Sequence, residues 1–235
     1  MKYSSIISAF LIGLGLVLSS LCLKSAIKGY GERDRVVTVR GLCEKEVQAN
    51  KVTWPLVTKE MGNDLPTIYD RIQATNDKIL QFLKSNGISA DEISVNSPDV
   101  TDRIADRYSD DNNISSRYSV TNVIVVTSSK VDLVRKLIDK QADLLRDGIA
   151  VIAGNYQYPT TYEYTELNSV KPEMIADATA KAREAADKFA QDSHSKLGKI
   201  KTASQGQFSI NDRDQFTPYI KNIRVVTTLE YYLED

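Results

Sequence analysis

The order in which strand-like and helical patterns follow one another is the feature that most restricts the fold of this chain. From about residue 44, an extended segment precedes a helical pattern, two strand patterns, a second helical pattern and another extended segment that ends near residue 166. Helices are predicted by apolar residues three, four or seven positions apart, and strands by β-branched runs such as RYSVTNVIVVTS at 117–128. Few arrangements can bury the apolar sides of elements in this β-α-β-β-α-β order.

The two helices of this pattern have recognisable ends. The first is predicted to begin at Asn63 or Asp64, which are helix-capping residue types, and to end at Gly87. Its apolar face consists of Leu65, Ile68, Ile72, Ile79 and Leu83. The second is predicted to begin near Ser129 and to stop at Gly148. Its apolar face consists of Val131, Val134, Leu137, Ile138, Leu144 and Leu145.

We therefore predict an α+β protein in which residues 44–166 form a ferredoxin-like βαββαβ plait. A strand at 36–41 and residues 167–235 are predicted to form a second αββ module packed with the plait. Its long Ala-rich helix, about 170–197, precedes strands at 199–210 and 220–232. The inner stripe of that helix is predicted to be Ile175, Ala178, Ala182, Ala185, Phe189 and Leu197, with small residues that allow close packing.

An apolar segment precedes the folded part. Residues 6–23 form an uncharged run of 18 residues, between the length of a secretory apolar region and the roughly 20 residues that span a bilayer. We predict that residues 1–32 are a membrane anchor or a cleaved signal segment, and that residues 33–235 form the α+β domain.

Composition and motifs argue against several function classes. The 30 Lys and Arg residues nearly balance the 31 Asp and Glu residues, so the chain lacks the positive charge typical of nucleic-acid binders. Two cysteines cannot build a disulfide framework. The single histidine, His194, lies in the polar stretch DSHSK and is expected to be solvated. No P-loop, dinucleotide-binding glycine motif or G-x-S-x-G sequence occurs outside the apolar run.

Acidic side chains cluster in two places. Asp99, Asp102, Asp106, Asp110 and Asp111 could hold calcium through oxygen ligands, but they lack the spacing and terminal Glu of an EF-hand loop. They are expected to form a solvated hairpin tip, and Asp212 and Asp214 a similar turn. We predict no enzyme activity, no catalytic residue, no metal site and no cofactor.

Four tyrosines form the candidate interaction face. Tyr156, Tyr158, Tyr162 and Tyr164 would share one side of an unbroken strand, although Pro159 interrupts the sequence between them. Aromatic residues are favoured both in sheets and at interfaces, so either sheet packing or a ligand or subunit contact fits this pattern.

Cys43 is a weaker candidate. A reactive thiol needs a lowered pKa, but Cys43 lies in extended sequence beside Glu44 and Glu46, whose negative charge disfavours the thiolate. Packing in a strand is the favoured interpretation, and a nucleophilic thiol is the alternative.

Two stretches carry a family resemblance over roughly residues 34–234. VVTVRGLCEKEVQANKVTW resembles the start of the SIMPL family (DUF541), with Gly41, Glu44 and Val47 at matching positions. ATAKAREAADKFAQDSHSKLGKIKTASQGQFSI resembles the Ala-rich helix, its Leu-Gly-x-Ile exit and the following strand. The matching residues there are Ala178, Ala182, Ala186, Ala190, Leu197, Gly198 and Ile200. Many members have a glycine at or beside the position of His194.

The resemblance implies an envelope protein of Gram-negative-type bacteria that assembles into rings or channel-like homo-oligomers, in some cases linked to oxidative-stress tolerance. Our first hypothesis is a self-assembling, non-enzymatic protein with a periplasmic domain, attached to the inner membrane by its N-terminal segment or secreted after cleavage. The second is a module that binds a small molecule or partner through the tyrosine face. The third is a thiol-based antioxidant enzyme that uses Cys43.

Overall fold

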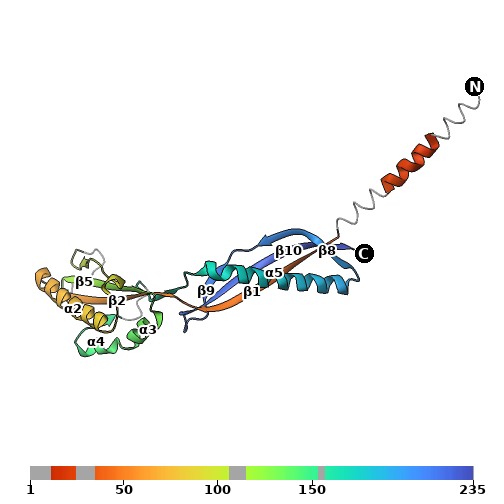
Figure 1. Ribbon diagram of the computed structural model, residues 1–235. Helices are drawn as coiled ribbons and strands as arrows, with labels where there is room; N and C mark the ends of the chain where they lie inside the picture. Colours follow the sequence, from red (N-terminus) through yellow and green to blue (C-terminus); the bar gives the residue numbers. More distant parts are fainter. Residues whose placement is uncertain (1–11, 25–34, 106–114, 153–156, 235) are drawn as a thin grey trace, which may run out of the picture. The chain divides into compact units, whose positions relative to one another are not determined.

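The computed structural model describes residues 12–24, 35–105, 115–152 and 157–234 (Figure 1). Helices and antiparallel sheets make up the fold, which confirms the predicted α+β class. The chain divides into two compact units. Unit 1 contains the described parts of 1–45, 168–209 and 223–235, and unit 2 contains those of 46–167 and 210–222.

Unit 2 is built on a sheet whose described strands pair antiparallel. The strands are β2 (Lys51–Gly62), β3 (Ile93–Val95), β4 (Asp99–Asp102), β5 (Tyr118–Ser128), β6 (Val151–Ile152) and β7 (Thr161–Glu163). The sheet order is β3-β5-β2-β6, with β4 also against β5 and β7 against β2. β2 and β5 pair from Val52 opposite Ser128 to Gly62 opposite Tyr118. This order is that of a split βαβ plait.

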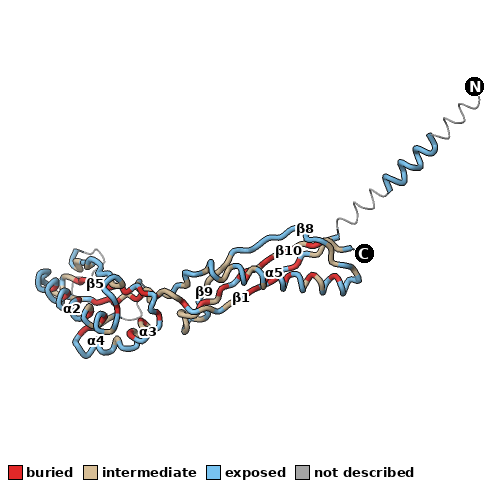
Figure 2. Tube along the Cα trace, in the orientation of Figure 1, coloured by how far each residue is buried: buried red, intermediate tan, exposed pale blue. Residues whose placement is uncertain are grey.

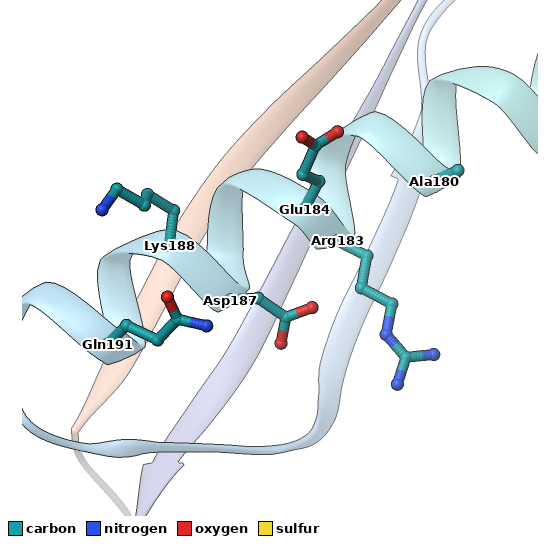
Figure 3. A pocket seen from close by; sticks show the side chains of 6 residues that line it. All are labelled: Ala180, Arg183, Glu184, Asp187, Lys188 and Gln191. Carbon is teal, nitrogen blue, oxygen red and sulfur yellow. The ribbon is translucent and has the colours of Figure 1, made fainter.

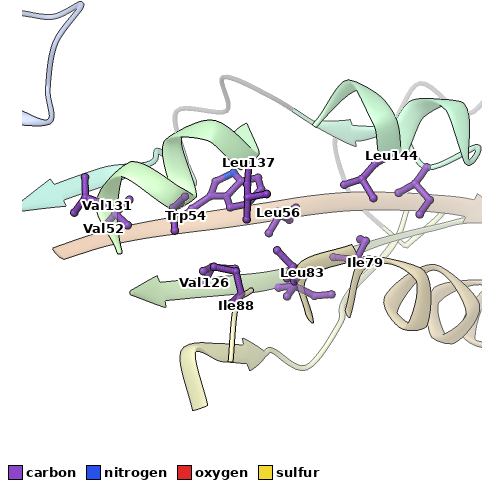
Figure 4. Close-up of a cluster of buried hydrophobic side chains, with 13 residues drawn as sticks. Val52, Trp54, Leu56, Ile79, Leu83, Ile88, Val126, Val131, Leu137 and Leu144 are labelled. Carbon is purple, nitrogen blue, oxygen red and sulfur yellow. The ribbon is translucent and has the colours of Figure 1, made fainter. Parts of the chain in front are cut away.

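Helices and a short turn complete unit 2 and supply its core. They are α2 (Leu65–Ser85), η2 (Ala90–Glu92), α3 (Val131–Asp139) and α4 (Ala142–Arg146). The main core joins β2 and β5 to all three α-helices (Figures 2 and 4). Its buried members are Val52, Trp54, Leu56, Ile79, Leu83, Ile88, Ile124, Val126, Val131, Val134, Leu137, Leu144 and Ile149.

The predicted second helix is divided into α3 and α4. Because the helix is interrupted after Asp139, the apolar face changes direction, and Leu144 is buried while Leu145 is 59% exposed. Leu145 was therefore wrongly assigned to the inner face. In α2, Leu65 was also misassigned, since it is 39% exposed at the start of the helix.

Glycines end α2 and α4 through the same backbone motif. Gly87 and Gly148 have φ values of +91° and +78°, a region that glycine adopts without strain. At each end the following amide reaches back five residues, from Ile88 to Leu83 O and from Ile149 to Leu144 O. These are Schellman caps, and each places two buried apolar side chains in contact with the core. Both predicted glycine stops are confirmed.

Pro55 lies where β2 is locally an edge strand. β7 pairs with residues 51–53 and β6 with Val57 and Thr58, so Pro55 lies between the two short partners. On its other side Pro55 is opposite Val125 in β5. A proline lacks the N–H of a ladder hydrogen bond, and this gap tolerates that loss.

A buried amide pair fixes α2 against β5. Asn122 Nδ2 donates to Asn76 Oδ1 at 2.6 Å, and the two residues are only 1% and 5% exposed. Polar groups in a core are costly unless they are paired, so this contact favours one placement of the helix over its neighbours.

Unit 1 contains a long helix on a sheet. The sheet order is β1-β10-β8. The short strand β9 (Ser209–Asp212), most of which belongs to unit 2, also pairs with β10. β1 spans Val36–Gln48, β8 spans Lys196–Gln205 and β10 spans Ile220–Glu234. β1 is thus longer than the predicted strand. Leu233 N donates to Arg35 O at 2.9 Å, and Arg224 lies 3.6 Å from Glu44, so β1 and β10 run antiparallel.

Helix α5 (Leu167–Asp192) lies unusually close to β1. Its buried residues recur at every fourth position: Met174, Ala178, Ala182, Ala186 and Ala190. A Cβ added to Gly41 would lie 1.9 Å from the Ala178 carbonyl oxygen and 2.9 Å from the Ala182 Cβ. The glycine and the alanines therefore create the close approach that small residues were predicted to allow.

Part of the predicted inner stripe of α5 is wrong. Phe189 is 61% exposed, and Ile175 and Ala185 are only half-buried, because the strict four-residue repeat of small side chains rather than the larger ones turns toward the sheet. Leu197 lies outside the helix, in β8, where it packs against the same cluster as Ala182 and Ala186.

The helix ends earlier than predicted, in a turn at His194. The φ of His194 is +54°, the only positive value among the described non-glycine residues. Its N–H donates to Gln191 O, and Ser195 N donates to Ala190 O at 2.9 Å. This is the Schellman cap of α2 and α4, with histidine at the position where they have glycine.

Residues 12–24 form an additional helix whose apolar side chains are exposed. No described helix has both the length and the apolar character required to cross a membrane. Residues 6–11 of the predicted anchor, and 25–32 of the segment that follows it, lie outside the described residues.

Replacing Gly41 by Ala is expected to lower the free energy of unfolding by about 3 kcal/mol, because the new methyl group would collide with helix backbone. Thermal unfolding of the full chain, followed by circular dichroism, measures this. Thr38→Ala, on the exposed side of the same strand, is the control and should change the free energy of unfolding by less than about 0.5 kcal/mol. An equally small effect of Gly41→Ala would contradict the close approach.

His194→Gly is expected to have the opposite sign and stabilise the protein by about 0.5–1 kcal/mol, since glycine removes the strain of a left-handed residue. His194→Ala keeps a Cβ and should give no gain. Chemical unfolding of the three proteins compares them. Equal stability of the glycine and alanine variants would show that the backbone at this turn is unstrained.

Candidate functional site

The tyrosine segment does not form one continuous strand. β7 covers only Thr161–Glu163, so Tyr162 is the one tyrosine of the four within a described strand. Tyr158 and Tyr164 are half-buried outside it, and Tyr156 lies outside the described residues. The shared face expected for an unbroken strand is therefore absent from the described part of this segment.

Tyr162 belongs to an aromatic and cationic cluster within unit 2. Its ring meets that of Tyr219 edge-on, with centroids 6.2 Å apart and planes at 69°. The Arg135 guanidinium carbon lies 3.4 Å from the Tyr219 ring centre, which places cation and ring in close contact. Both tyrosines pack against the main core. Arg135 and Tyr219 were missed by sequence reasoning, because no local pattern links positions so far apart.

This cluster is held by polar contacts that leave it little freedom. Asp132 lies 3.4 Å from Arg135 and accepts a hydrogen bond from Gln48 Nε2 at 3.0 Å. The Tyr219 carbonyl accepts from Ala49 N at 2.8 Å. Burial raises the pKa of Tyr162, so the phenol stays protonated at neutral pH. Held by these contacts, the two rings and the guanidinium can contribute an aromatic and cationic contact surface.

Cys43 is buried beneath α5, with 5% of its surface exposed. Burial raises the pKa of its thiol, and a hydrogen bond to the Asp177 carboxylate adds to that effect. Asp177 itself is paired with Lys181 at 2.7 Å. Since the thiolate is the reactive form, these surroundings disfavour nucleophilic or antioxidant chemistry at Cys43.

Three of the other polar candidates have structural partners. Asp102 pairs with Arg117 at 2.8 Å and accepts from the backbone of Ile104. Asp214 accepts hydrogen bonds from the Thr217 hydroxyl and from two backbone amides. These bonds, together with the neighbouring Arg213 guanidinium, lower the pKa of Asp214 to about 2. Asp212 pairs with Lys221. His194 is exposed at the end of α5, and Asp99 is exposed in β4. Asp106, Asp110 and Asp111 lie outside the described residues.

Among the described residues, no three His, Cys, Asp or Glu side chains lie close enough together to hold a metal ion. An open depression of about 400 Å³ lies on α5 (Figure 3). It is lined by Ala180, Arg183, Glu184, Asp187, Lys188 and Gln191. All six come from one helix and nearly all are charged or polar. Ligand sites usually have apolar walls from several elements, so this depression is a solvated helix surface.

The protein family of this chain follows from its match to a family profile. Residues 37–222 match the SIMPL family, described as "Protein of unknown function (DUF541)". The chain belongs to the SIMPL family. The match covers most of the chain, including all the residues of β2 to β9, and it confirms the resemblance noted from the sequence. A search of curated proteins found no match to this SIMPL chain.

Sequence reasoning also missed a second carboxylate of unit 2 with a strongly lowered pKa in this SIMPL protein. Glu92 accepts hydrogen bonds from Ser128 Oγ at 2.6 Å, Ser89 N at 2.8 Å and Lys130 Nζ at 2.9 Å. These contacts lower its pKa from 4.5 to about 2, against the opposing effect of burial. They join η2 to the end of β5 and the start of α3. The role of Glu92 is therefore structural.

Because the folded pKa of Glu92 lies below the unfolded value, its contribution to stability is complete above about pH 4.5 and is lost as the pH falls toward 2. Glu92→Gln is expected to lower the free energy of unfolding by about 2 kcal/mol at pH 7, and by much less near pH 2.5. Urea unfolding at both pH values measures the difference. Glu163→Gln, an exposed partner of Lys51, is the control and should have little effect at either pH. A loss that is independent of pH would refute the assignment.

Proposed function

We propose that this SIMPL protein is a non-enzymatic component of the bacterial cell envelope that works by self-assembly. The observation that carries the proposal is the sheet of unit 1. Helix α5 packs against one side of β1 and β10, while β8 is largely exposed and neither β1 nor β8 has a described partner on its outer edge. Unpaired strand edges are places where further chains can add.

The exposed side of the unit 1 sheet is polar rather than apolar. Arg224 pairs with Glu44, and Lys201 and Thr202 both contact Glu230. A surface of this composition remains soluble in a single chain and still offers directional contacts to another copy. These properties suit an assembly whose subunits first fold separately.

Envelope attachment through the N-terminal segment is part of the proposal. Ile12, Leu16 and Leu23 are each more than 60% exposed in the helix at 12–24. Apolar side chains in such a row are stabilised when something other than water covers them. A role in oxidative-stress tolerance stays a prediction of the resemblance, to be checked by peroxide survival of cells that lack the protein. The half-buried, core-packed Tyr162 favours no second function.

The native mass of the full chain in detergent, measured by light scattering behind a sizing column, tests self-assembly. We expect a defined oligomer whose mass, corrected for detergent, is unchanged over at least a tenfold range of concentration. A single-chain mass at the highest concentration would refute the proposal. Repeating the measurement at high salt shows whether exposed charge pairs contribute, because salt screens them.

A further inference from the structure

On β1, the residues whose backbone groups point away from β10 are also the residues whose side chains are exposed. The Arg35 carbonyl accepts a hydrogen bond from β10, so in a regular strand the backbone groups of the odd-numbered residues point toward β10. The backbone groups of Arg40, Leu42 and Glu44 then point away from it. These three side chains are exposed, whereas Val39, Gly41 and Cys43 are buried under α5.

β1 is also the less protected of the two edges. β8 carries Lys196, Lys199 and Lys201, and its pairing with β10 shifts register near Tyr231. Lysines and irregular pairing are features by which proteins block unwanted strand addition. From Val36 to Cys43, β1 has a single charged residue, Arg40, and its burial alternates without interruption from Thr38 to Glu44.

We propose that β1 pairs antiparallel with β1 of a second copy of this chain, about a two-fold axis at Leu42. This inference rests on the proposed self-assembly and names the surface that carries it. In this register Leu42 lies opposite Leu42 of the second copy, and Arg40 lies opposite Glu44 in both directions. Leu42, which is 37% exposed in the single chain, is then covered by Leu42 of the second copy. One pair of opposite charges lies on each side of this leucine contact.

Neighbouring registers are less favourable. A shift by two residues in one direction places Arg40 opposite Leu42, which leaves the charge without a partner. A shift in the other direction places Arg40 opposite Glu46 but sets Leu42 against Glu44. Only the register centred on Leu42 pairs leucine with leucine and arginine with glutamate. Registers that differ by a single residue would exchange the two faces of the strand.

The charges already present on the sheet extend this pairing. Glu44 lies 3.6 Å from Arg224 of its own β10, and Arg40 has no ion-pair partner among the described residues. In the paired sheet, Arg40 of the second copy would lie on the other side of Glu44. A row of Arg224, Glu44 and Arg40 would then cross three adjacent strands, with the carboxylate between the two cations.

Thiol cross-linking of the full chain in detergent tests the position of the axis. In a background with Cys22→Ser and Cys43→Ala, Leu42→Cys places two thiols on residues whose Cα atoms are about 5.5 Å apart, within reach of a disulfide. Oxidation is expected to give a covalent dimer on a non-reducing gel. Thr38→Cys is the matched control, because its two copies would be about 27 Å apart. Equal cross-linking of both variants would overturn the proposal.

A charge exchange tests the register. Arg40→Glu and Glu44→Arg each place like charges opposite one another and are each expected to weaken self-association about tenfold. A mixture of the two variants restores both pairs and should associate more tightly than either variant alone. Lys199→Glu, on the β8 edge, should have little effect. Weakening by Lys199→Glu without weakening by Arg40→Glu would assign the contact to β8 and overturn the proposal.

Different results would exclude self-assembly altogether or the β1 interface alone. A single-chain native mass removes self-assembly and this interface together. A stable oligomer that neither cross-links through Leu42→Cys nor responds to Arg40→Glu removes the β1 interface alone. Heterogeneous cross-linking without recovery in the mixed variants also counts against the Leu42 axis.

Discussion

The close approach of α5 to β1 at Gly41 is the contact on which the rest of unit 1 depends. Any side chain at residue 41 would occupy the space of the Ala178 carbonyl, so the glycine and the four-residue alanine repeat require one another. Val39, Leu229 and Tyr231 pack beside this contact and fill the remaining space under the helix. Shape rather than large apolar area holds the helix in place, because alanines bury little surface each.

Unit 2 reaches its stability in a different way. Its core uses large side chains such as Trp54, Leu56 and Ile124, which are nearly inaccessible to water. Its helices are stopped by glycine caps that place Leu83 and Leu144 in that core. The hydrogen bonds of Glu92 then fasten η2 and α3 to the end of β5. Local backbone signals and a large apolar core are consistent with one another here, which favours a unique fold.

The parts of the structure that could be predicted are those that short stretches of sequence determine locally. Gly87 and Gly148 indicate helix ends because glycine adopts the left-handed backbone conformation without strain. The order of strands and helices predicts the plait. The end of α5 was misplaced because His194 adopts that same backbone without the glycine that would signal it. The tyrosine cluster was missed for another reason. Its cation, Arg135, and its second ring, Tyr219, come from segments that only the folded chain brings together.

The two units are interleaved along the chain, and this has a consequence for how the protein is made. The sheet of unit 1 contains β1, but it also requires β8 and finally β10, the last of the described strands, together with helix α5. β1 is therefore synthesised long before its neighbour β10, and it stays unpaired while β2 to β7 are synthesised and can fold. Long-range pairing of this kind is slow, and a strand exposed meanwhile is prone to aggregate. A chaperone that covers nascent β1 until β10 has been made would prevent this aggregation.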